Sequence, residues 1–248
     1  MEEFVVNKQA IKELIKSVPQ QISKLYVSVD ARGEDIKEII LLARQNKVAF
    51  LSAPRQKLME IYNKGYSGVL AVISKVKYYT TEEVLLDLCD DKPSIIVVLD
   101  EISDPQNFGS ILRSCAAFEV DAVIIQQWNQ AQVTQTVMDV SRGAVRVVPI
   151  VKEKNVYNAI KKLKEKNFWV YGTVVPSESN TDVLDFNNLS GNKIAVVFGN
   201  EHKGVRKNII SECDGVISIK HSQDMQSLNV SVACGIVLYE LYKNLIKD

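Results

Sequence analysis

Apolar positions in residues 1–77 change their period several times, and each change predicts a boundary between a helix and a strand. Segments with apolar residues at helical spacing alternate with short apolar runs that are typical of strands. Helices are expected at 7–18, 33–47 and 54–64, and strands at 24–30, 48–52 and 65–74. Pro54 suits the first turn of its helix. This order predicts a small α/β unit.

The second part of the chain, from Ser94 onwards, contains strand-like runs that are apolar at every position rather than at alternate ones. Such strands are buried on both faces, as in a parallel sheet covered by helices. Strands are expected at 94–100, 121–126, 145–150, 168–175, 193–199 and 214–220, and helices at 109–119, 134–143, 155–166, 204–213 and 227–246. With 75–92 interpreted as a linker, the predicted domains are 1–74 and 93–248.

Composition narrows the class of protein. The chain has 248 residues, 46% hydrophobic and 24% charged, which is enough for one large or two modest domains. No apolar run approaches the ~20 residues that span a bilayer, and the acidic start does not resemble a signal peptide. The four cysteines form no CxxC pair and are expected to be reduced, in a cytoplasmic protein. Two histidines without cysteine pairs predict no metal site.

Charge is distributed unevenly although the net charge is zero. Residues 1–77 contain 13 Lys and Arg against 8 Asp and Glu, a net charge of +5, so the remainder of the chain carries −5. A basic excess in one domain suggests contact with a polyanion such as a nucleic acid. An ordinary solvated surface is the alternative interpretation.

Polar residues gather in three turns that follow predicted buried strands. Ligands of open parallel sheets bind at the carboxyl ends of the strands, so these turns are candidates for one shared pocket. They are "DPQNFGSILRS" at 104–114, "VVFGNEHKGV" at 196–205 and "ISIKHSQDMQSLNVSVA" at 217–233. Competing motifs are absent from the sequence: the dinucleotide fingerprint, the P-loop, the nucleophile elbow of hydrolases and the zinc-protease motif.

Each turn also has a purely structural interpretation. Asn107 could cap a helix, and Arg113 could be a surface arginine. Glu201 could be an acidic residue placed in a first helical turn because the helix dipole favours it there. Ser227 could be an N-cap, with Asn229 in the first turn that follows.

The three turns together resemble a known family. "DPQNFGSILRSCAAF", "FGNEHKG" and "SLNVSVACGIVLYE" are similar to the three signature motifs of the SpoU family of RNA ribose 2′-O-methyltransferases, within the SPOUT superfamily. The resemblance implies a parallel-sheet SPOUT domain with a C-terminal trefoil knot. Residues 1–74 resemble the small α/β ribosomal-protein-like RNA-binding domain of the bacterial enzymes that methylate a guanosine of 23S ribosomal RNA.

The resemblance also implies a reaction and a set of site residues. S-adenosylmethionine would donate a methyl group to a ribose 2′-hydroxyl of RNA, without a metal, in a homodimer. The residues implied to meet the cofactor are Thr173, Gly199, Ile219 and Leu228. The residues implied to surround the reacting ribose are Asn107, Arg113, Glu201, Ser227 and Asn229.

Two questions stay open at this point. A guanidinium remains protonated, so Arg113 is better suited to holding a phosphate than to accepting a proton, and Glu201 is the better acceptor. A transfer-RNA ribose methyltransferase and a non-catalytic RNA-binding protein of the same fold are the alternative functions. The chain departs from the family's third motif at Lys220, His221 and Gln223.

Overall fold

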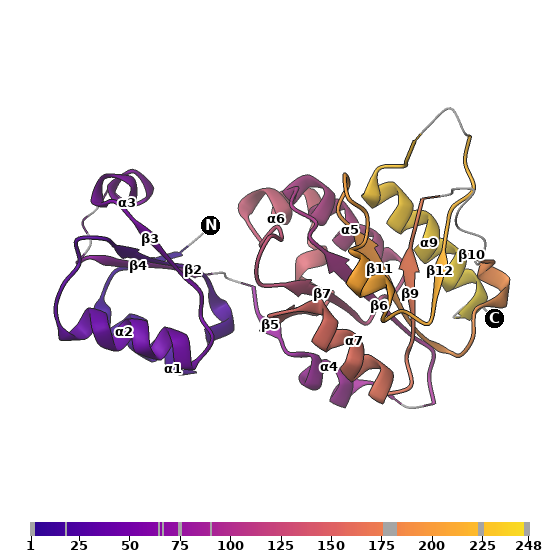
Figure 1. The fold of residues 1–248 in the computed structure, drawn as a ribbon, viewed down its shortest axis with the longest axis horizontal. Coiled ribbons are helices and arrows are strands. Elements are labelled where there is room, and N and C mark those ends of the chain that lie inside the picture. Colours follow the sequence, from indigo (N-terminus) through magenta and orange to yellow (C-terminus); the bar gives the residue numbers. More distant parts are fainter. Residues whose placement is uncertain are drawn as a thin grey trace. The chain divides into compact units, whose positions relative to one another are not determined.

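The structure is a computed structural model of the full chain, and it divides into two compact units, Met1–Lys77 and Tyr78–Asp248 (Figure 1). Each unit is described by itself. The residues that the structure describes are 3–17, 19–63, 65, 67–73, 76–89, 91–175, 183–222 and 226–245. Gln223, one of the departures from the third motif, lies outside them.

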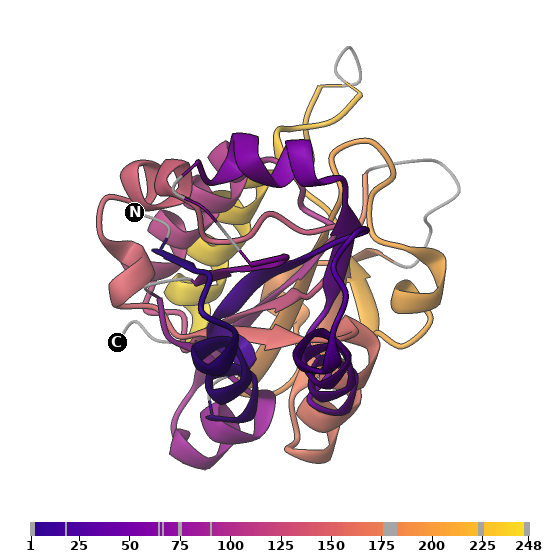
Figure 2. The same ribbon diagram turned by 90° about the vertical axis from the view of Figure 1, so that its left-hand side faces the viewer.

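The described residues of the smaller unit form a four-stranded mixed sheet with three α-helices. Its strands are β1 (Glu3–Val5), β2 (Ile22–Ser28), β3 (Phe50–Ala53) and β4 (Val69–Ile73), in the order β1-β4-β2-β3. Its helices are α1 (Lys8–Ser17), α2 (Glu34–Gln45) and α3 (Arg55–Ile61). Ile11, Ile15 and Ile39 pack from α1 and α2 against the sheet, and α3 lies on the other side (Figure 2). The predicted alternation of helices and strands is confirmed here, and β1 was not predicted.

The larger unit is built on one parallel sheet of eight strands. The order is β10-β12-β9-β11-β6-β7-β8-β5, and every neighbouring pair is parallel. The strands are β5 (Tyr78–Tyr79), β6 (Ser94–Asp100), β7 (Ala122–Gln126), β8 (Ile150–Glu153), β9 (Trp169–Thr173), β10 (Val183–Leu184), β11 (Lys193–Gly199) and β12 (Gly215–Ile217). β6, β7 and β11 are buried along their whole length, which confirms the predicted fold class.

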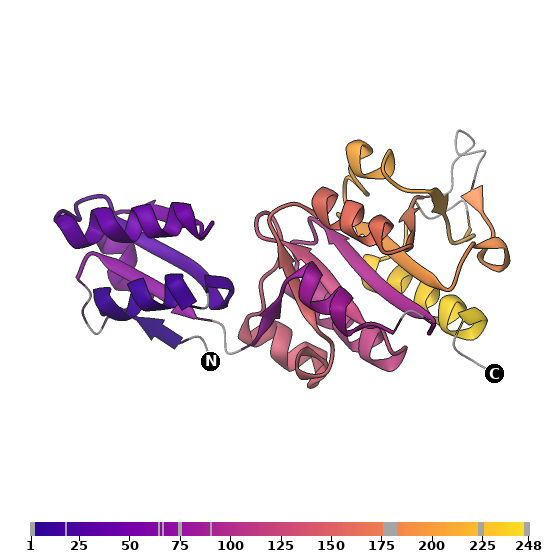
Figure 3. The ribbon, with the colours of Figure 1, turned by 90° about the horizontal axis from the view of Figure 1, so that it is seen from below.

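Helices cover both faces of this sheet. They are α4 (Thr81–Asp87), α5 (Pro105–Ala117), α6 (Gln135–Ser141), α7 (Val156–Glu165), α8 (Lys207–Ile210) and α9 (Val230–Leu245). Apolar residues of α4, α7 and α8 share a core with one face of the central strands, and Figure 3 shows α4 and α7 in front of the strands. α5, α6 and α9 cover the opposite face (Figure 1). Among the described residues, none of the helices has the length and apolarity to cross a membrane.

Three local predictions differ from the structure. The strand expected at 145–150 is a 3-10 turn at Ala144–Arg146, and β8 begins only at Ile150. Pro149 has no N–H to donate to a sheet, which explains the late start of that strand. The expected linker 75–92 contains β5, which pairs with β8, and α4, which a capping box at Thr80 begins. The helix expected at 204–213 is reduced to α8.

The position of β11 matters for the site. β11 lies between β6 and β9, two strands that precede it in the chain. Gly199 at its carboxyl end therefore lies directly beside Asp100 of β6. The loop after β11 and the turn before α5 are thus brought together at one edge of the sheet. The trefoil knot of this region stays a prediction.

Candidate active site

A cavity of about 700 Å³ opens at the carboxyl ends of β9, β11 and β12. Its walls come from these strand ends, from the loop after β11, from the segment before α9 and from the first turns of α9. All four residues implied to meet a cofactor line it: Thr173, Gly199, Ile219 and Leu228. Glu201 and Ser227 line it too. The structure thus brings six of the nine candidate residues to one cavity.

Gly199 lies in close contact with the backbone of the loop that follows β11. A Cβ atom added there would lie 2.0 Å from the backbone nitrogen of Val205 and 2.1 Å from the carbonyl carbon of Gly204. The chain turns back here because Gly204 N donates a hydrogen bond to the Asn200 carbonyl at 2.8 Å. The loop from Asn200 to Val205 is therefore folded directly over the end of β11, and only glycine fits beneath it.

Asn107 connects the three polar turns. It is buried in the first turns of α5, and its Nδ2 donates to Glu201 Oε1 at 2.8 Å. Its Oδ1 accepts a hydrogen bond from Asn229 Nδ2 at 3.0 Å. A continuous chain of hydrogen bonds thus runs from Asn229 through Asn107 to Glu201. The carboxylate can only accept, so it fixes the orientation of the Asn107 amide.

The structure shows which side chains cap α5 and α9. Asp104, not Asn107, caps α5, because its Oδ1 accepts a hydrogen bond from Gln106 N at 2.9 Å. At α9 the capping side chain is Asn229, whose Oδ1 accepts from Ser231 N at 2.9 Å, and not Ser227. Asn107 therefore has no capping role, whereas Asn229 both caps α9 and contacts Asn107.

Arg113 lies apart from the other candidates. It is exposed on α5, it does not line the cavity, and it has no hydrogen bond or ion pair with the described residues. Its neighbour Ser114 faces α9, where a Cβ added to Gly235 would lie 3.5 Å from Ser114 Oγ. Among the described residues Arg113 is thus an unpaired cation, one position before Ser114 at the contact of α5 with α9.

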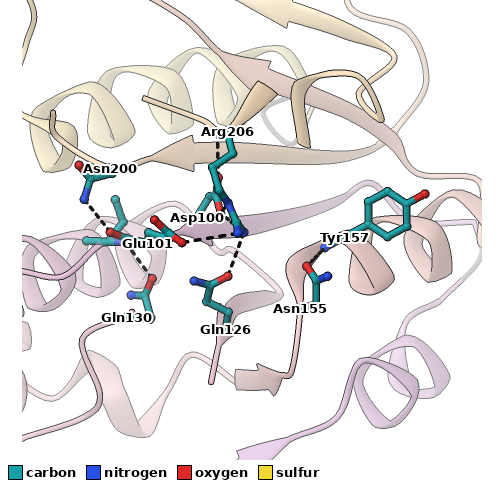
Figure 4. Close-up of polar contacts among 9 residues, drawn as sticks. Asp100, Glu101, Gln126, Gln130, Asn155, Tyr157, Asn200 and Arg206 are labelled. Atoms are coloured by element: carbon teal, nitrogen blue, oxygen red, sulfur yellow. Dashed lines mark hydrogen bonds and ion pairs between the residues drawn. The ribbon is translucent and has the colours of Figure 1, made fainter. Parts of the chain in front are cut away.

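Arg206 and Asp100 are polar residues of the site that the sequence analysis missed. The Asp100 side chain is fully buried at the end of β6 and accepts hydrogen bonds from Arg206 N at 3.0 Å and from Arg206 Nε at 2.8 Å (Figure 4). Arg206 Nη2 also donates to Gln126 Oε1 at 3.0 Å, and Nη1 lies 3.5 Å from Glu101 Oε1. The hydrogen bond with Asp100 raises the pKa of the Arg206 guanidinium. The sequence held one signal for this pair: Asp100 directly follows the apolar run 95–99, and a buried carboxylate needs a partner.

The loop after β11 is attached to β6 at both of its ends. Asn200 Nδ2 donates to the Glu101 carbonyl at 3.0 Å, and Arg206 holds Asp100 at the other end of the loop (Figure 4). Glu101 adopts a left-handed backbone conformation, with φ of 65°, where its carbonyl meets Asn200. These contacts fix the position of Glu201, which lies between the two attachments.

The departures from the third motif also bear on the cavity. His221 lines it, and its Nδ1 lies 2.9 Å from the Ile219 carbonyl, so that nitrogen carries the proton and donates. Lys220 is exposed. Within the described ranges no cluster of three or more His, Cys, Asp or Glu could hold a metal ion.

Comparison with known proteins identifies the family. Residues 94–239 match the profile of the SpoU rRNA Methylase family, and residues 8–79 match the profile described as RNA 2′-O ribose methyltransferase substrate binding. A protein of Staphylococcus saprophyticus named as a TrmH family tRNA/rRNA methyltransferase is 34% identical over 245 residues, covering 98% of this chain and 96% of that protein. A protein of the same description from Staphylococcus aureus is 32% identical over 241 residues, 96% of this chain and 95% of its own.

Solved structures share the fold. The SpoU methyltransferase AviRb from Streptomyces viridochromogenes, in complex with AdoMet, superimposes with a TM-score of 0.62 at 18% identity, covering 100% of this chain and 92% of that one. An AdoMet-bound rRNA methyltransferase from Sinorhizobium meliloti gives a TM-score of 0.59 at 17% identity, over 99% and 88% of the two chains. The resemblance drawn from the three motifs is confirmed, and the chain belongs to the SpoU rRNA Methylase family of RNA methyltransferases.

Proposed function

We propose that this protein transfers a methyl group from S-adenosylmethionine to the 2′-hydroxyl of a ribose in RNA, with a guanosine of 23S ribosomal RNA as the substrate. The observation that carries the proposal is the hydrogen-bonded chain Asn229–Asn107–Glu201 beside the cavity at the strand ends. A protein that only bound RNA would have no need of a buried amide that orients a carboxylate at the mouth of such a cavity.

The cavity fits a nucleoside-sized methyl donor. Its volume of about 700 Å³ lies within the ~300–1,000 Å³ typical of sites for small ligands. The apolar residues Ile217, Leu228 and Val237 line it together with the polar residues Asn200, Glu201 and Ser227, so it combines apolar walls with hydrogen-bonding groups. S-adenosylmethionine, when bound, supplies an electrophilic methyl group on a sulfonium. We assign its binding to Thr173, Gly199, Ile219 and Leu228.

The chain's own residues would align and activate the ribose. In-line displacement at a methyl carbon depends mainly on alignment, which can lower a barrier by ~7–11 kcal/mol when the geometry is right. Asn107 donates to Oε1 of Glu201, and Oε2 has no hydrogen bond with the described residues. Oε2 would therefore be available to accept the proton that the 2′-hydroxyl loses on methylation. Arg113, which is exposed on α5 and does not line the cavity, would hold a phosphate of the RNA with its planar guanidinium. Ser227 and Asn229 would also lie beside the ribose that accepts the methyl group.

The two units would divide the work. Residues 1–74, with their net positive charge, would select the RNA, and residues 93–248 would carry the transfer. The match of residues 8–79 to a substrate-binding profile supports this assignment.

A test of the proposal measures single-turnover transfer of labelled methyl groups to transcripts of 23S ribosomal RNA and to transfer RNA, followed by mapping of the methylated ribose. Transfer to a 2′-hydroxyl of a 23S guanosine is the expected result. Methylation of transfer RNA alone would instead support the main alternative, a transfer-RNA ribose methyltransferase. Binding of both RNAs without transfer by folded protein would favour the non-catalytic alternative.

We also propose a homodimer formed through α9. Val232, Ile236 and Tyr239 are 51%, 37% and 53% exposed and recur at helical spacing along one face of this helix. Cys234 does not face this surface: it packs inside the unit against Cys115 of α5, where burial raises the pKa of the Cys115 thiol. A second copy covering the exposed face would place Arg113 beside the interface.

Light scattering tests the dimer. Ile236→Asp should convert it to a monomer, because a charge on the apolar face would be buried without a partner. Leu86→Asp is the matched control, since Leu86 is 79% exposed on α4 and lies outside the proposed interface. A wild-type monomer at micromolar concentration would contradict the proposal.

A further inference from the structure

Trp128 presents an exposed indole at the same sheet edge as the candidate active site. It follows β7 in the stretch "QQWNQ", and 47% of its surface is exposed. Tryptophan carries a large apolar surface that proteins usually bury or use for contact with a partner. Trp128 does not line the cavity at β9, β11 and β12, so its exposure is not explained by the donor site.

The loop that carries Trp128 is held firmly at both ends. Gln127 N donates to the Glu153 carbonyl at 2.7 Å, and Ala131 N donates to the Ile102 carbonyl at 2.8 Å. The buried Gln130 adds a third attachment, because its Oε1 accepts from Ile102 N at 2.9 Å. The indole is therefore mounted on a fixed loop rather than on a free tip, and the entropy cost of using it in binding is small.

The hydrogen bonds of this loop connect it to the segments that carry Asn107 and Glu201. Ile102 comes two residues before Asp104, the cap of α5, and Asn107 stands in the first turns of the same helix. On the other side, Gln126 at the end of β7 accepts a hydrogen bond from Arg206, which ends the loop carrying Glu201 (Figure 4). Trp128 thus belongs to the same hydrogen-bonded edge as Asn107 and Glu201.

We propose that Trp128 is a stacking position for a nucleobase of the RNA substrate, next to the nucleotide whose ribose is methylated. The inference rests on the proposed function and adds a subsite to it. An exposed, rigid aromatic ring binds unpaired bases whatever their identity, because every base has a π-face. The exposed amide of Asn129, next to Trp128, can donate to and accept from base edges. Stacking would hold the strand open where the ribose must reach Glu201.

The second tryptophan provides a matched control. The chain contains two tryptophans, and Trp169 is 43% exposed, close to the exposure of Trp128. Trp169 is the first residue of β9, at the amino edge of the parallel sheet, opposite the site. Its ring packs over Gly191, where an added Cβ would lie 2.4 Å from Trp169 Cδ1. Trp169 therefore has a packing role, and no contact with RNA is expected of it.

Two single-tryptophan proteins test the inference directly. Trp169→Phe leaves Trp128 as the only indole, and Trp128→Phe leaves Trp169. Titration with a single-stranded 12-nucleotide RNA and with transcribed 23S ribosomal RNA should quench the fluorescence of the first protein and leave the second unchanged. The quenching should persist at raised salt better than phosphate contacts do, because those weaken steeply with ionic strength.

Kinetics provide the second readout. Trp128→Ala should raise KM for RNA by about tenfold, equivalent to ~1.4 kcal/mol, with kcat and the affinity for S-adenosylmethionine changed less than twofold. Trp128→Phe should recover most of the loss, because phenylalanine also stacks. Trp169→Phe should leave all three quantities unchanged.

Several outcomes would overturn the inference. They are an unchanged KM in Trp128→Ala, quenching of Trp128 by S-adenosylmethionine alone, and a change of oligomeric state in Trp128→Ala, which would make Trp128 a contact between copies. Absence of methyl transfer by the wild-type protein would instead contradict the proposed function. The fluorescence titration would still decide whether Trp128 binds RNA.

Discussion

Asp100 is fully buried at the end of β6, and Arg206 donates to both of its carboxylate oxygens, through the backbone N–H to one and through Nε to the other. The two residues lie 106 positions apart in the chain. Their pairing closes the loop that carries Glu201, so the position of Glu201 depends on this ion pair.

Replacement of Arg206 should separate a positional effect from a general loss of stability. Arg206→Gln leaves a buried carboxylate without its cation, so we expect the free energy of unfolding to fall by about 2 kcal/mol and single-turnover methyl transfer by at least tenfold. Arg206→Lys should recover much of the stability but less of the rate, because lysine cannot reproduce the fork that holds Asp100 and Gln126 together.

The control for Arg206 is another ion pair of the same unit. Lys164 pairs with Asp214 at 2.8 Å, with a side-chain exposure of 36% against 34% for Arg206. Lys164→Gln should lower the melting temperature without changing the rate of transfer at temperatures where the protein stays folded. Equal losses of rate in the two variants would mean that Arg206 acts only through stability.

Asn107 and Glu201 should behave as one unit in catalysis. Asn107→Ala and Glu201→Gln are each expected to lower single-turnover transfer by about 100-fold, the equivalent of ~2.7 kcal/mol. The double variant should lose little more than either single variant, because the amide acts by orienting the carboxylate. Calorimetry with S-adenosylmethionine should show affinities near that of the wild type. Fully additive losses would contradict the hydrogen-bonded chain as a functional unit.

Gly199→Ala tests the close approach over β11. The added methyl group would stand 2.0 Å from Val205 N, so the loop must move away from the cavity. We expect at least a tenfold loss of S-adenosylmethionine affinity and a lower melting temperature. Gly235→Ala is the control, because its nearest contact would be 3.5 Å, an ordinary distance, and alanine favours the helix by up to ~1 kcal/mol. Unchanged affinity in Gly199→Ala would remove that glycine from the donor site.

Arg113→Lys distinguishes a surface arginine from a functional one. Arg113 is exposed and unpaired within the described part of the chain, so its replacement should leave the melting temperature within 1 °C or so, by the usual size of surface effects. If the planar guanidinium holds a phosphate of the RNA, lysine should lower methyl transfer by about 100-fold. A lysine variant with the wild-type rate would mean that Arg113 is an ordinary surface residue with no specific role in methyl transfer.

Lys152 gives a prediction about pH. Burial lowers the pKa of Lys152 to about 8, with its Nζ 5.0 Å from the centre of the Tyr78 ring. Below pH 8 the folded protein carries this charge in a partly buried position. Between pH 8 and about 10.5 the unfolded chain binds a proton that the folded protein has lost, so the free energy of unfolding rises with pH. Lys152→Met should therefore stabilise the protein by about 1–2 kcal/mol near pH 7, and the gain should shrink by pH 10.

Chemical denaturation at the two pH values measures this effect. Lys161 serves as control, because it also lies over a tyrosine ring, that of Tyr157 at 4.5 Å, but is exposed. A side-chain hydrogen bond with Tyr157 raises the pKa of Lys161. Lys161→Met should give no gain at pH 7. A difference between wild type and Lys152→Met that did not vary with pH would contradict the burial of the charge.

The central strands were predictable from sequence because their apolar runs coincide with the buried segments. β6 and β11 have the bounds expected from the pattern, 94–100 and 193–199. β5 and β10 have two residues each, too few to show any period, and their place in the sheet comes from tertiary contacts. The prediction of a strand at 145–150 was wrong because it gave more weight to the apolar β-branched residues than to Pro149, which cannot donate a backbone hydrogen bond.

The site was predictable only where motifs marked it. The three polar turns followed from their place after predicted buried strands, whereas the roles expected of single residues came from the resemblance to a family. No local pattern shows that Asn107 meets Glu201 across 94 positions. Arg206 carried no motif signal, and its pairing with Asp100 is a consequence of strand order. Trp128 was not singled out because exposure cannot be read from a single residue type.

The place of β11 between β6 and β9 sets a condition on how the chain is made. Lys193 pairs with Ser94, so the partner of β6 leaves the ribosome about a hundred residues after it, roughly 5–20 s at ~5–20 residues per second. β9 is complete before β11, and an unpaired strand edge is a template for any strand that arrives. The nascent protein must therefore keep β6 and β9 from pairing with each other, because that contact would close the sheet over the position that β11 has to enter.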